Sequence, residues 1–326
     1  NFNSNIALDK ISVRSNVNLN LTKSTEMIIR INANFDDYSG PIDGGEGMFN
    51  KVMRANPVLY PAYYAPDEAN AYTDHILFGN TATANYINPY ADMVKGYKEY
   101  SRTVVLAQAE IKQNFDFITK GLTARVMANT TRTSYFDLSR AYSPYYYVIS
   151  KYDKMDKTYT LSNTNENSAK EWLVYTPGDK IIESTFYLEA AAQYDRTFAE
   201  KHSVGGLLVY TMKTSLVGSA KDLPKSLPYR NIGLAGRFTY GYDSRYFIEG
   251  NFGYNGSERF AKKHRFGFFP SIGAGWMISN ENFFKPLSKV LTQLKLKATY
   301  GLVGNDAIGN ENDRFFYMSQ VNQGAG

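Results

Sequence analysis

The chain has 326 residues and a formal net charge of +5, and it is 43% hydrophobic and 15% aromatic, with 27 tyrosines and no cysteine. The absence of cysteine excludes disulfide bonds and thiolate metal sites, and there is no apolar run long enough to predict a membrane-spanning helix. The 36 basic and 31 acidic residues are spread along the chain, so the charge pattern predicts no nucleic-acid partner.

The N-terminal region predicts a β-hairpin. Apolar and polar residues alternate over residues 10–21 and again over residues 27–35, with a polar stretch between them. Strict alternation is typical of strands that have one apolar and one polar face. Residues 1–10 contain neither a basic start nor an apolar stretch, so we expect no signal peptide in this stretch.

The same alternation returns in later pairs of segments, and together they predict about ten strands of roughly nine to thirteen residues in about five hairpins. The connections inside the hairpins are short and polar, whereas those between hairpins are long. The predicted later strands are 104–114 with 122–130, 185–194 with 202–212, 237–242 with 246–254, and 268–278 with 291–303. The predicted long connections are approximately 37–99, 134–183, 214–231 and 256–267.

The predicted fold class is an all-β, antiparallel transmembrane barrel portion with long extracellular loops. The strand lengths match the roughly nine to eleven residues that a tilted strand needs to cross a bilayer. The polar face suits a water-filled lumen, the aliphatic face suits lipid, and Tyr242, Tyr246 and Trp276 near strand ends suit an aromatic girdle. A large soluble β protein would also alternate, and it stays open as an alternative.

Residues 227–284 contain several motifs in a fixed order. They are Gly236-Arg237 with Tyr240, Tyr242 and Arg245-Tyr246, then Gly256-Ser257 with Arg259-Phe260, then Phe269-Pro270-Ser271 and Gly275-Trp276. This stretch closely resembles the SusC/RagA family of TonB-dependent outer-membrane transporters, and residues 88–126 and 294–309 resemble the same family. One run, Asn255-Gly256-Ser257-Glu258-Arg259-Phe260, departs from the usual Asp-Gly-Ser-Ser-Arg-Phe, which leaves the detail of that loop open.

The resemblance implies an architecture larger than this chain. Members of the family have an N-terminal plug domain inside a barrel of about 22 strands, an even number as in other bacterial outer-membrane barrels. We therefore expect residues 1–326 to form one partial barrel domain, with the plug, the TonB box and the remaining strands absent from this chain. An open sheet edge in lipid would leave backbone groups unpaired at a cost of several kcal/mol each, roughly, which supports this expectation.

The resemblance also implies a function, namely TonB-dependent active import of a bulky nutrient, a glycan or an oligopeptide, across the bacterial outer membrane. The implied partners are a SusD-like surface lipoprotein that acts as a lid, the TonB complex, which would act through the plug segment, outer-membrane lipid, and a second transporter–lipoprotein pair. The implied protein is integral to the outer membrane, needs no cofactor and is not an enzyme. A passive porin, a soluble surface-exposed β-rich binding protein and an outer-membrane hydrolase are the alternatives.

Two sets of residues are candidates for binding. Aromatic rings pack against sugar faces and peptide side chains, so tyrosines in the long connections are candidates for substrate or lid contact, although packing of loop against loop is the competing interpretation. These tyrosines are Tyr60, Tyr63, Tyr64, Tyr145, Tyr146 and Tyr147. Candidates for lumen or plug contact, with simple solvation as the alternative, are Arg30, Glu110, Arg125, Arg237, Glu249 and Lys297.

The sequence predicts no catalytic or metal site. His75, His202 and His264 are isolated from one another and form no nucleophile–base pattern. The glycine-rich residues 41–49 are expected to form a flexible loop with no helix after it, and the acidic residues around them lack the spacing of a calcium-binding loop.

Overall fold

The computed structural model describes residues 6–220, 222–306 and 317. Tertiary contacts divide the chain into two compact units. The first, which we call the loop unit, comprises residues 1–12, 34–103 and 134–181, and the second, the strand unit, comprises residues 13–33, 104–133 and 182–326.

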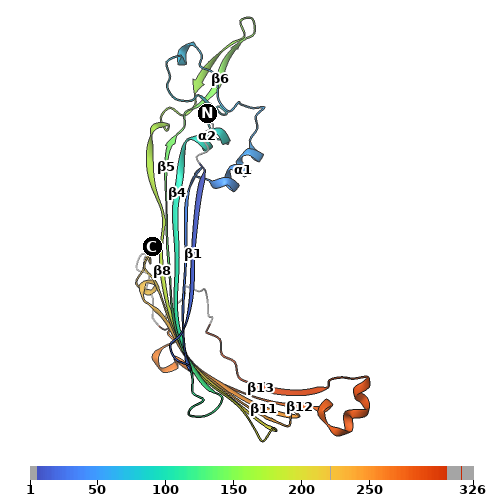
Figure 1. The fold of residues 1–326 in the computed structure, drawn as a ribbon. Helices are drawn as coiled ribbons and strands as arrows, with labels where there is room; N and C mark the ends of the chain where they lie inside the picture. The colour runs from blue at the N-terminus through green and yellow to red at the C-terminus, as the bar shows by residue number, and fades with distance from the viewer. Residues whose placement is uncertain (1–5, 221, 307–316, 318–326) are drawn as a thin grey trace. The chain divides into compact units, whose positions relative to one another are not determined.

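The main element is a ten-stranded sheet (Figure 1). Its strands are neighbours in the order in which they occur along the chain, and the three strands that interrupt this order form a separate sheet. The sheet has the order β1 (Ala7–Asn20), β2 (Thr25–Gly40), β4 (Gly96–Asn114), β5 (Leu122–Ser143), β8 (Lys170–Phe198), β9 (His202–Val217), β10 (Tyr229–Tyr242), β11 (Tyr246–Ser257), β12 (Phe266–Met277) and β13 (Lys295–Gly301). Sequential neighbours of this kind form a meander, which confirms the predicted succession of hairpins.

The register of the strand unit separates polar from apolar residues. On β10 and β11, Arg237 lies opposite Asn251 and Thr239 opposite Glu249, whereas Tyr240 lies opposite Ile248. Because successive side chains of a strand point to opposite faces, the first two pairs share one face and the third lies on the other. The pairing continues across β12 and β13, where Ile272 lies opposite Tyr300. The alternation in the sequence therefore becomes two chemically distinct faces.

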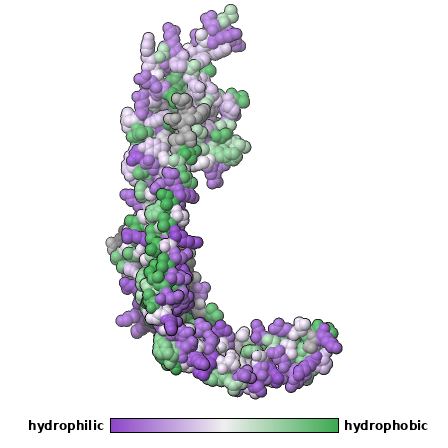
Figure 2. Space-filling model, viewed as in Figure 1, coloured by the Kyte–Doolittle hydropathy of each residue, from purple (hydrophilic) through white to green (hydrophobic). Residues whose placement is uncertain are grey.

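The apolar face of the strand unit is open. Its large side chains include several that are more than half exposed, among them Phe238 (54%), Ile272 (60%) and Tyr300 (74%). Figure 2 shows hydrophobic residues, in green, gathered along strands of the large sheet. A soluble sandwich packs this face against a second sheet, whereas a membrane barrel presents it to lipid. The structure is an all-β portion of a barrel, as the sequence predicts.

The bounds of the long connections differ from the prediction. β2 continues to Gly40 and β4 begins at Gly96, so the first connection covers residues 41–95 and not 37–99. β5 continues to Ser143 and β8 begins at Lys170, so the second covers 144–169 and not 134–183. Residues 170–183 of β8 are exposed throughout. Alternation marks only the part of a strand that has one apolar face, so it misses extensions that are exposed on both faces.

The long connections of the loop unit carry short elements of their own. The first holds α1 (Gly44–Arg54), η1 (Glu68–Asn70), β3 (Phe78–Gly79) and α2 (Pro89–Val94), and the second holds β6 (Tyr146–Asp153) and β7 (Thr158–Asn163). Strands β3, β6 and β7 form the three-stranded sheet. Tyr64, Leu77, Tyr147 and Leu161 make a buried cluster in this unit. The loop unit thus has a small core.

The helix α1 corrects the expectation that no helix follows the glycine-rich residues. Gly44 adopts a φ of 65°, which a glycine tolerates, and the chain then turns into the helix. Glu46 lies in the first turn, Lys51 and Arg54 lie in the last, and Met48 is buried. An acidic residue in the first turn and basic residues in the last turn stabilise a helix through its dipole. This charge pattern was overlooked because the glycine-rich residues predicted a loop.

The remaining helical elements are short. They are α3 (Leu223–Ser226), η2 (Lys262–His264), η3 (Ile278–Asn280) and η4 (Asn282–Lys289). Within the described residues, no helix has both the length and the apolar character that spanning a membrane requires.

Candidate functional site

The polar face of the strand unit carries ion pairs between neighbouring strands. Arg30 Nη1 lies 3.4 Å from Glu110 Oε2, and Arg237 Nη2 lies 2.8 Å from Glu249 Oε2. Four of the residues predicted to face the lumen are therefore brought together in two pairs. Arg125 instead donates to Glu189, which was not among the predicted candidates.

These ion pairs differ in burial. The Glu110 side chain is only 7% exposed and also lies 3.7 Å from Lys112 Nζ, whereas the side chains of Arg237 and Glu249 are 54% and 38% exposed. Exposed pairs contribute about 0–1 kcal/mol, because water competes for both charges. The face is thus a charged wall on which the Glu110 carboxylate is better buried than that of Glu249.

Lys297, the last of these candidates, lies on β13 opposite Gly275. It lines a cavity of about 720 Å³ together with Arg237 and Glu249. Glycines at 273 and 275 leave room between these charged side chains. Contact of these residues with substrate or plug stays a prediction.

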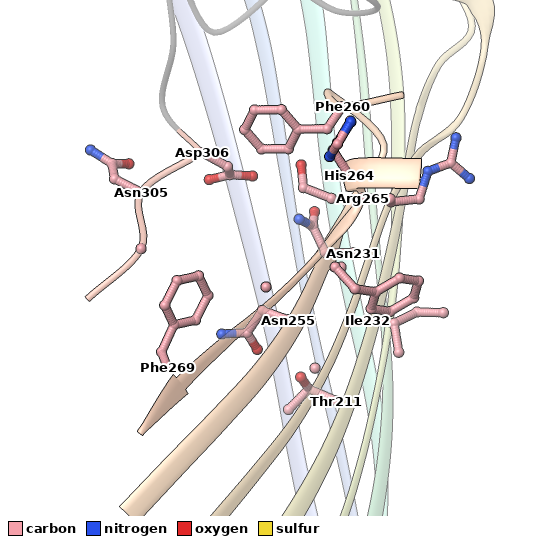
Figure 3. Close-up of a pocket in the computed structure, with 16 residues that line it drawn as sticks. Thr211, Asn231, Ile232, Asn255, Phe260, His264, Arg265, Phe269, Asn305 and Asp306 are labelled. Atoms are coloured by element: carbon pink, nitrogen blue, oxygen red, sulfur yellow. The ribbon is translucent and has the colours of Figure 1, made fainter. Parts of the chain in front are cut away.

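A second cavity, of about 480 Å³, lies near the ends of β9–β12 where the connections are longer. Figure 3 shows Thr211, Asn231 and Asn255 on the strands, with Phe260, His264 and Asp306 on the segments beyond them. The rings of Phe260 and Phe269 border it. Here the face offers amides, a hydroxyl and aromatic rings in place of paired charges.

A glycine creates the space in this second cavity. Gly233 pairs with Thr211 on one side and Asn255 on the other, and a Cβ at residue 233 would lie 2.8 Å and 2.7 Å from their side-chain oxygens. A larger residue at position 233 would therefore fill part of this cavity. The alternation of residues does not point to this cavity, although glycine inside a strand is the signal that could have indicated it.

Three of the candidate loop tyrosines are buried. Tyr60, Tyr64 and Tyr147 are 5%, 8% and 4% exposed. The Tyr60 hydroxyl donates to the backbone oxygen of Ile87, and the Tyr147 hydroxyl lies 2.9 Å from Nε2 of His75. These tyrosines pack inside the loop unit, the arrangement that the competing interpretation describes.

The other loop tyrosines have partners but are more accessible. Tyr145 stacks on the ring of His75 at 4.1 Å between ring centroids, and Tyr146 lies near the ring of Phe78. Burial, together with the charge of nearby Asp92, raises the pKa of Tyr146 to about 12, so its hydroxyl stays protonated at neutral pH. Tyr63 is 58% exposed, and its ring lies 5.6 Å from that of Tyr90 between centroids. Of the set, Tyr63 presents the most open ring, and its contact with substrate or lid stays a prediction.

No catalytic constellation stands out in the described part of the chain. His75 Nδ1 lies 3.0 Å from Glu171, and His202 Nδ1 lies 2.8 Å from the Tyr240 hydroxyl. His264 lines the second cavity. Among the described residues, no group of three or more histidine, aspartate or glutamate side chains is placed to hold a metal ion.

Comparison with known proteins gives matches over part of the chain. No protein-family model matches. TonB-dependent receptor P39 of Formosa agariphila is 31% identical over 169 residues, which cover 42% of this chain and 16% of that receptor. TonB-dependent receptor SusC of Bacteroides thetaiotaomicron is 41% identical over 83 residues, which cover 26% of this chain and 8% of that receptor.

Solved structures match over nearly the whole chain. The RagAB peptide importer in its closed-closed state aligns with 94% of this chain at a TM-score of 0.58 and 16% identity, and the RagAB peptide transporter aligns with 94% at a TM-score of 0.54 and 18% identity. In both cases the aligned part is 34% of the solved chain. At this identity the likeness concerns the fold.

The proteins matched here are named as receptors and transporters and none as an enzyme, in agreement with the prediction that the chain is not an enzyme. The chain spans about a third of the solved transporter chains, and the matched stretches are smaller fractions of the curated receptors. The curated relatives and the solved structures together support the prediction that the chain is a fragment similar to SusC/RagA-like TonB-dependent receptors.

Proposed function

We propose that the protein imports a bulky nutrient, a glycan or an oligopeptide, across the bacterial outer membrane by TonB-dependent transport. The observation that carries the proposal is the ten-stranded sheet, whose one face is apolar and open while the other carries ion pairs such as Arg237–Glu249. A wall of this kind separates lipid from a water-filled path. The similarity to TonB-dependent receptors supports energised import over passive flow.

Residues 1–326 would contribute one stretch of barrel wall to this transporter. The outer strands of the sheet, β1 and β13, have one neighbour each in the described part of the chain. In lipid their free backbone groups need further strands as partners, which the rest of the barrel would supply. A plug inside the barrel would contact the polar face, where Arg30, Glu110, Arg125 and Lys297 lie.

The loop unit would meet the partners outside the membrane. A SusD-like surface lipoprotein would cover it as a lid, and two transporter–lipoprotein pairs would assemble together. The similarity of fold to the RagAB peptide transporter supports this part of the proposal. The buried cluster of Tyr64, Leu77, Tyr147 and Leu161 would give the loops a fixed shape for such docking.

The first test is purification of the parent protein from its own cells. An epitope in the turn between β6 and β7, where Met155 is 91% exposed, would leave the sheets intact. We expect recovery only after detergent extraction of the outer membrane, as a polypeptide longer than this chain and together with a lipoprotein. Recovery from the aqueous fraction without detergent would overturn the proposal and support the soluble alternative.

A second measurement separates active import from a porin. Oligosaccharides or oligopeptides that co-purify with the complex would be supplied to cells with and without TonB. We expect uptake to require TonB, since energy must reach the barrel from the inner membrane. Uptake that is equal in the two strains would contradict the proposal and favour a passive pore.

A further inference from the structure

The loop between β11 and β12 has an unusual charge. Residues 258–265 hold four lysines and arginines against one acidic residue, Glu258. The turn at the other end of β11, residues 243–245, holds one acidic and one basic residue, and so does the turn between β8 and β9, residues 199–201. The two ends of this part of the sheet therefore differ in charge. In outer-membrane barrels the short turns lie on the periplasmic side, so the basic end is the outer one.

Strand register extends this positive charge onto the apolar face. Arg230 pairs with Thr214 and lies two residues before Ile232 on β10, so both side chains belong to the same face. On that face the rings of Tyr254 and Phe266 stack at 5.2 Å between centroids. Arg230 is exposed and stands at the outer end of this apolar surface.

Two lysines of η2 are exposed and lie outside the lining of the second cavity. A 3₁₀-helix has three residues per turn, so successive side chains of Lys262–His264 are rotated by about 120°. His264 lines the second cavity (Figure 3). Lys262 and Lys263 are not among its lining residues. Both lysines are exposed.

The other two cations of the loop are engaged within the chain. Arg259 Nη1 donates to the backbone oxygen of Asp306 at 3.1 Å, and Arg265 Nη1 lies 3.9 Å from Glu258. Arg230, Lys262 and Lys263 form no ion pair with the other described residues. They constitute a set of exposed charges, which we call the basic rim.

We propose that the basic rim binds the phosphate groups of lipid A in the outer leaflet of the outer membrane. This inference rests on the proposed function, because it requires the apolar face to lie in that membrane. Lysine and arginine bind phosphate through charge-assisted hydrogen bonds, and the apolar surface beside Arg230 would contact the acyl chains of the same lipid. Each basic residue beside an anionic lipid surface raises affinity about fivefold.

An acidic segment of a partner lipoprotein is the competing occupant. A lid approaches from the water above the barrel and would be met by residues that face the lumen or the solvent. Arg230 lies on the apolar face, in line with Ile232 and beside the outward-facing aromatic pair. This position favours a lipid headgroup.

The test is a titration of the full-length receptor in detergent with lipid A, followed by native mass spectrometry. The rim variant carries Arg230→Gln, Lys262→Gln and Lys263→Gln. Its matched control carries Lys120→Gln, Lys201→Gln and Lys289→Gln, exposed lysines at the other end of the strands, so both lose three charges. Dephosphorylated lipid A tests whether the phosphates are recognised apart from the acyl chains.

We expect wild-type receptor and control to bind lipid A alike, and the rim variant to bind about a hundredfold more weakly, which is about fivefold for each charge removed. Dephosphorylated lipid A should bind equally weakly to all three. If the rim variant binds lipid A as tightly as the wild type, the proposal is overturned. It is also overturned if the rim variant loses the lipoprotein but still binds lipid A. Failure of the import function would instead appear as TonB-independent uptake with the lipid titration unchanged.

Discussion

The loop unit and the strand unit use apolar residues in opposite ways. In the loop unit Leu77 and Tyr147 are 3% and 4% exposed, whereas in the strand unit Phe238 and Ile272 are 54% and 60% exposed. The first unit is organised around its own core, as a soluble domain is. The second leaves its apolar side chains for an external apolar medium. The difference shows that one chain contains a unit that buries its apolar side chains and a unit that exposes them.

The largest expected effect comes from emptying the core of the loop unit. Tyr147→Ala removes a buried ring and its bond to His75, and we expect a loss of about 3–5 kcal/mol of local stability. Hydrogen exchange of β6 and β7 in the full-length receptor would measure it. Tyr72→Ala is the control, since Tyr72 is fully exposed, and equal effects of the two changes would refute the assignment of this core.

The next effect comes from placing a charge on the apolar face of the strand unit. Ile272→Lys should cost about 2–4 kcal/mol, because a lysine near the bilayer centre loses its hydration. Reduced insertion into the outer membrane, measured by fractionation and by heat-dependent gel mobility, would report it. Ser271→Lys, the adjacent residue on the polar face, should insert normally. If it fails as badly, the two faces are wrongly assigned.

A smaller effect separates the ion pairs of the polar face. Glu110→Gln leaves Arg30 and Lys112 without their carboxylate, at an expected cost of about 1.5–3 kcal/mol, since Glu110 is largely buried. Glu249→Gln breaks an exposed pair and should cost no more than about 1 kcal/mol. Urea unfolding of the receptor in vesicles compares the variants, and the reverse order would contradict the burial argument.

The smallest effect is a pH dependence confined to the loop unit. Burial alone would raise the pKa of the Asp92 carboxyl, but hydrogen bonds from the ammonium groups of Lys51 and Lys95 outweigh burial and hold the pKa below its ordinary value. A carboxyl whose pKa is lowered on folding stabilises the fold fully at a pH above the pKa that the group has in the unfolded chain, which is about 4. This stabilisation is lost as the pH falls through the pKa of the carboxyl in the folded protein.

We therefore expect the link between α1 and α2 to loosen in acid and to be intact at neutral pH. Hydrogen exchange of residues 44–54, corrected for intrinsic rates, would follow it. Asp92→Asn should weaken the link at neutral pH and remove this part of the pH dependence. Protection that stays unchanged from pH 7 to pH 3 in wild type would show that the Lys51–Asp92 contact contributes nothing.

Much of the strand unit could be predicted because its signal is local. The alternation of Phe238, Tyr240 and Tyr242 with polar neighbours predicts a two-faced strand, and the structure has it. The helix α1 and the outer extensions of β5 and β8 could not be predicted in this way. The β8 extension carries apolar residues such as Trp172 and Leu173 in a consecutive run without strict alternation, and α1 follows a glycine-rich stretch. The pairing of β5 with β8 is a tertiary feature that no single stretch of sequence shows.

The candidate site was predictable in part. The sequence marks Arg30, Glu110, Arg237 and Glu249 as polar-face residues, but it does not say which carboxylate meets which guanidinium. Glu189 was not among the candidates, and only the pairing of β5 with β8 brings it to Arg125. The cavity beside Gly233 was missed because its lining residues come from four strands, β9–β12, and the segments beyond them.

The sequence by itself determined that the strands are two-faced, because side-chain direction alternates by covalent geometry in any extended chain. It also carried the motifs that point to SusC/RagA-like receptors. Only the tertiary structure decided which tyrosines are buried, which charges pair and where the cavities lie. These features depend on the register between strands and on packing among distant segments, and neither is encoded in any one stretch of residues.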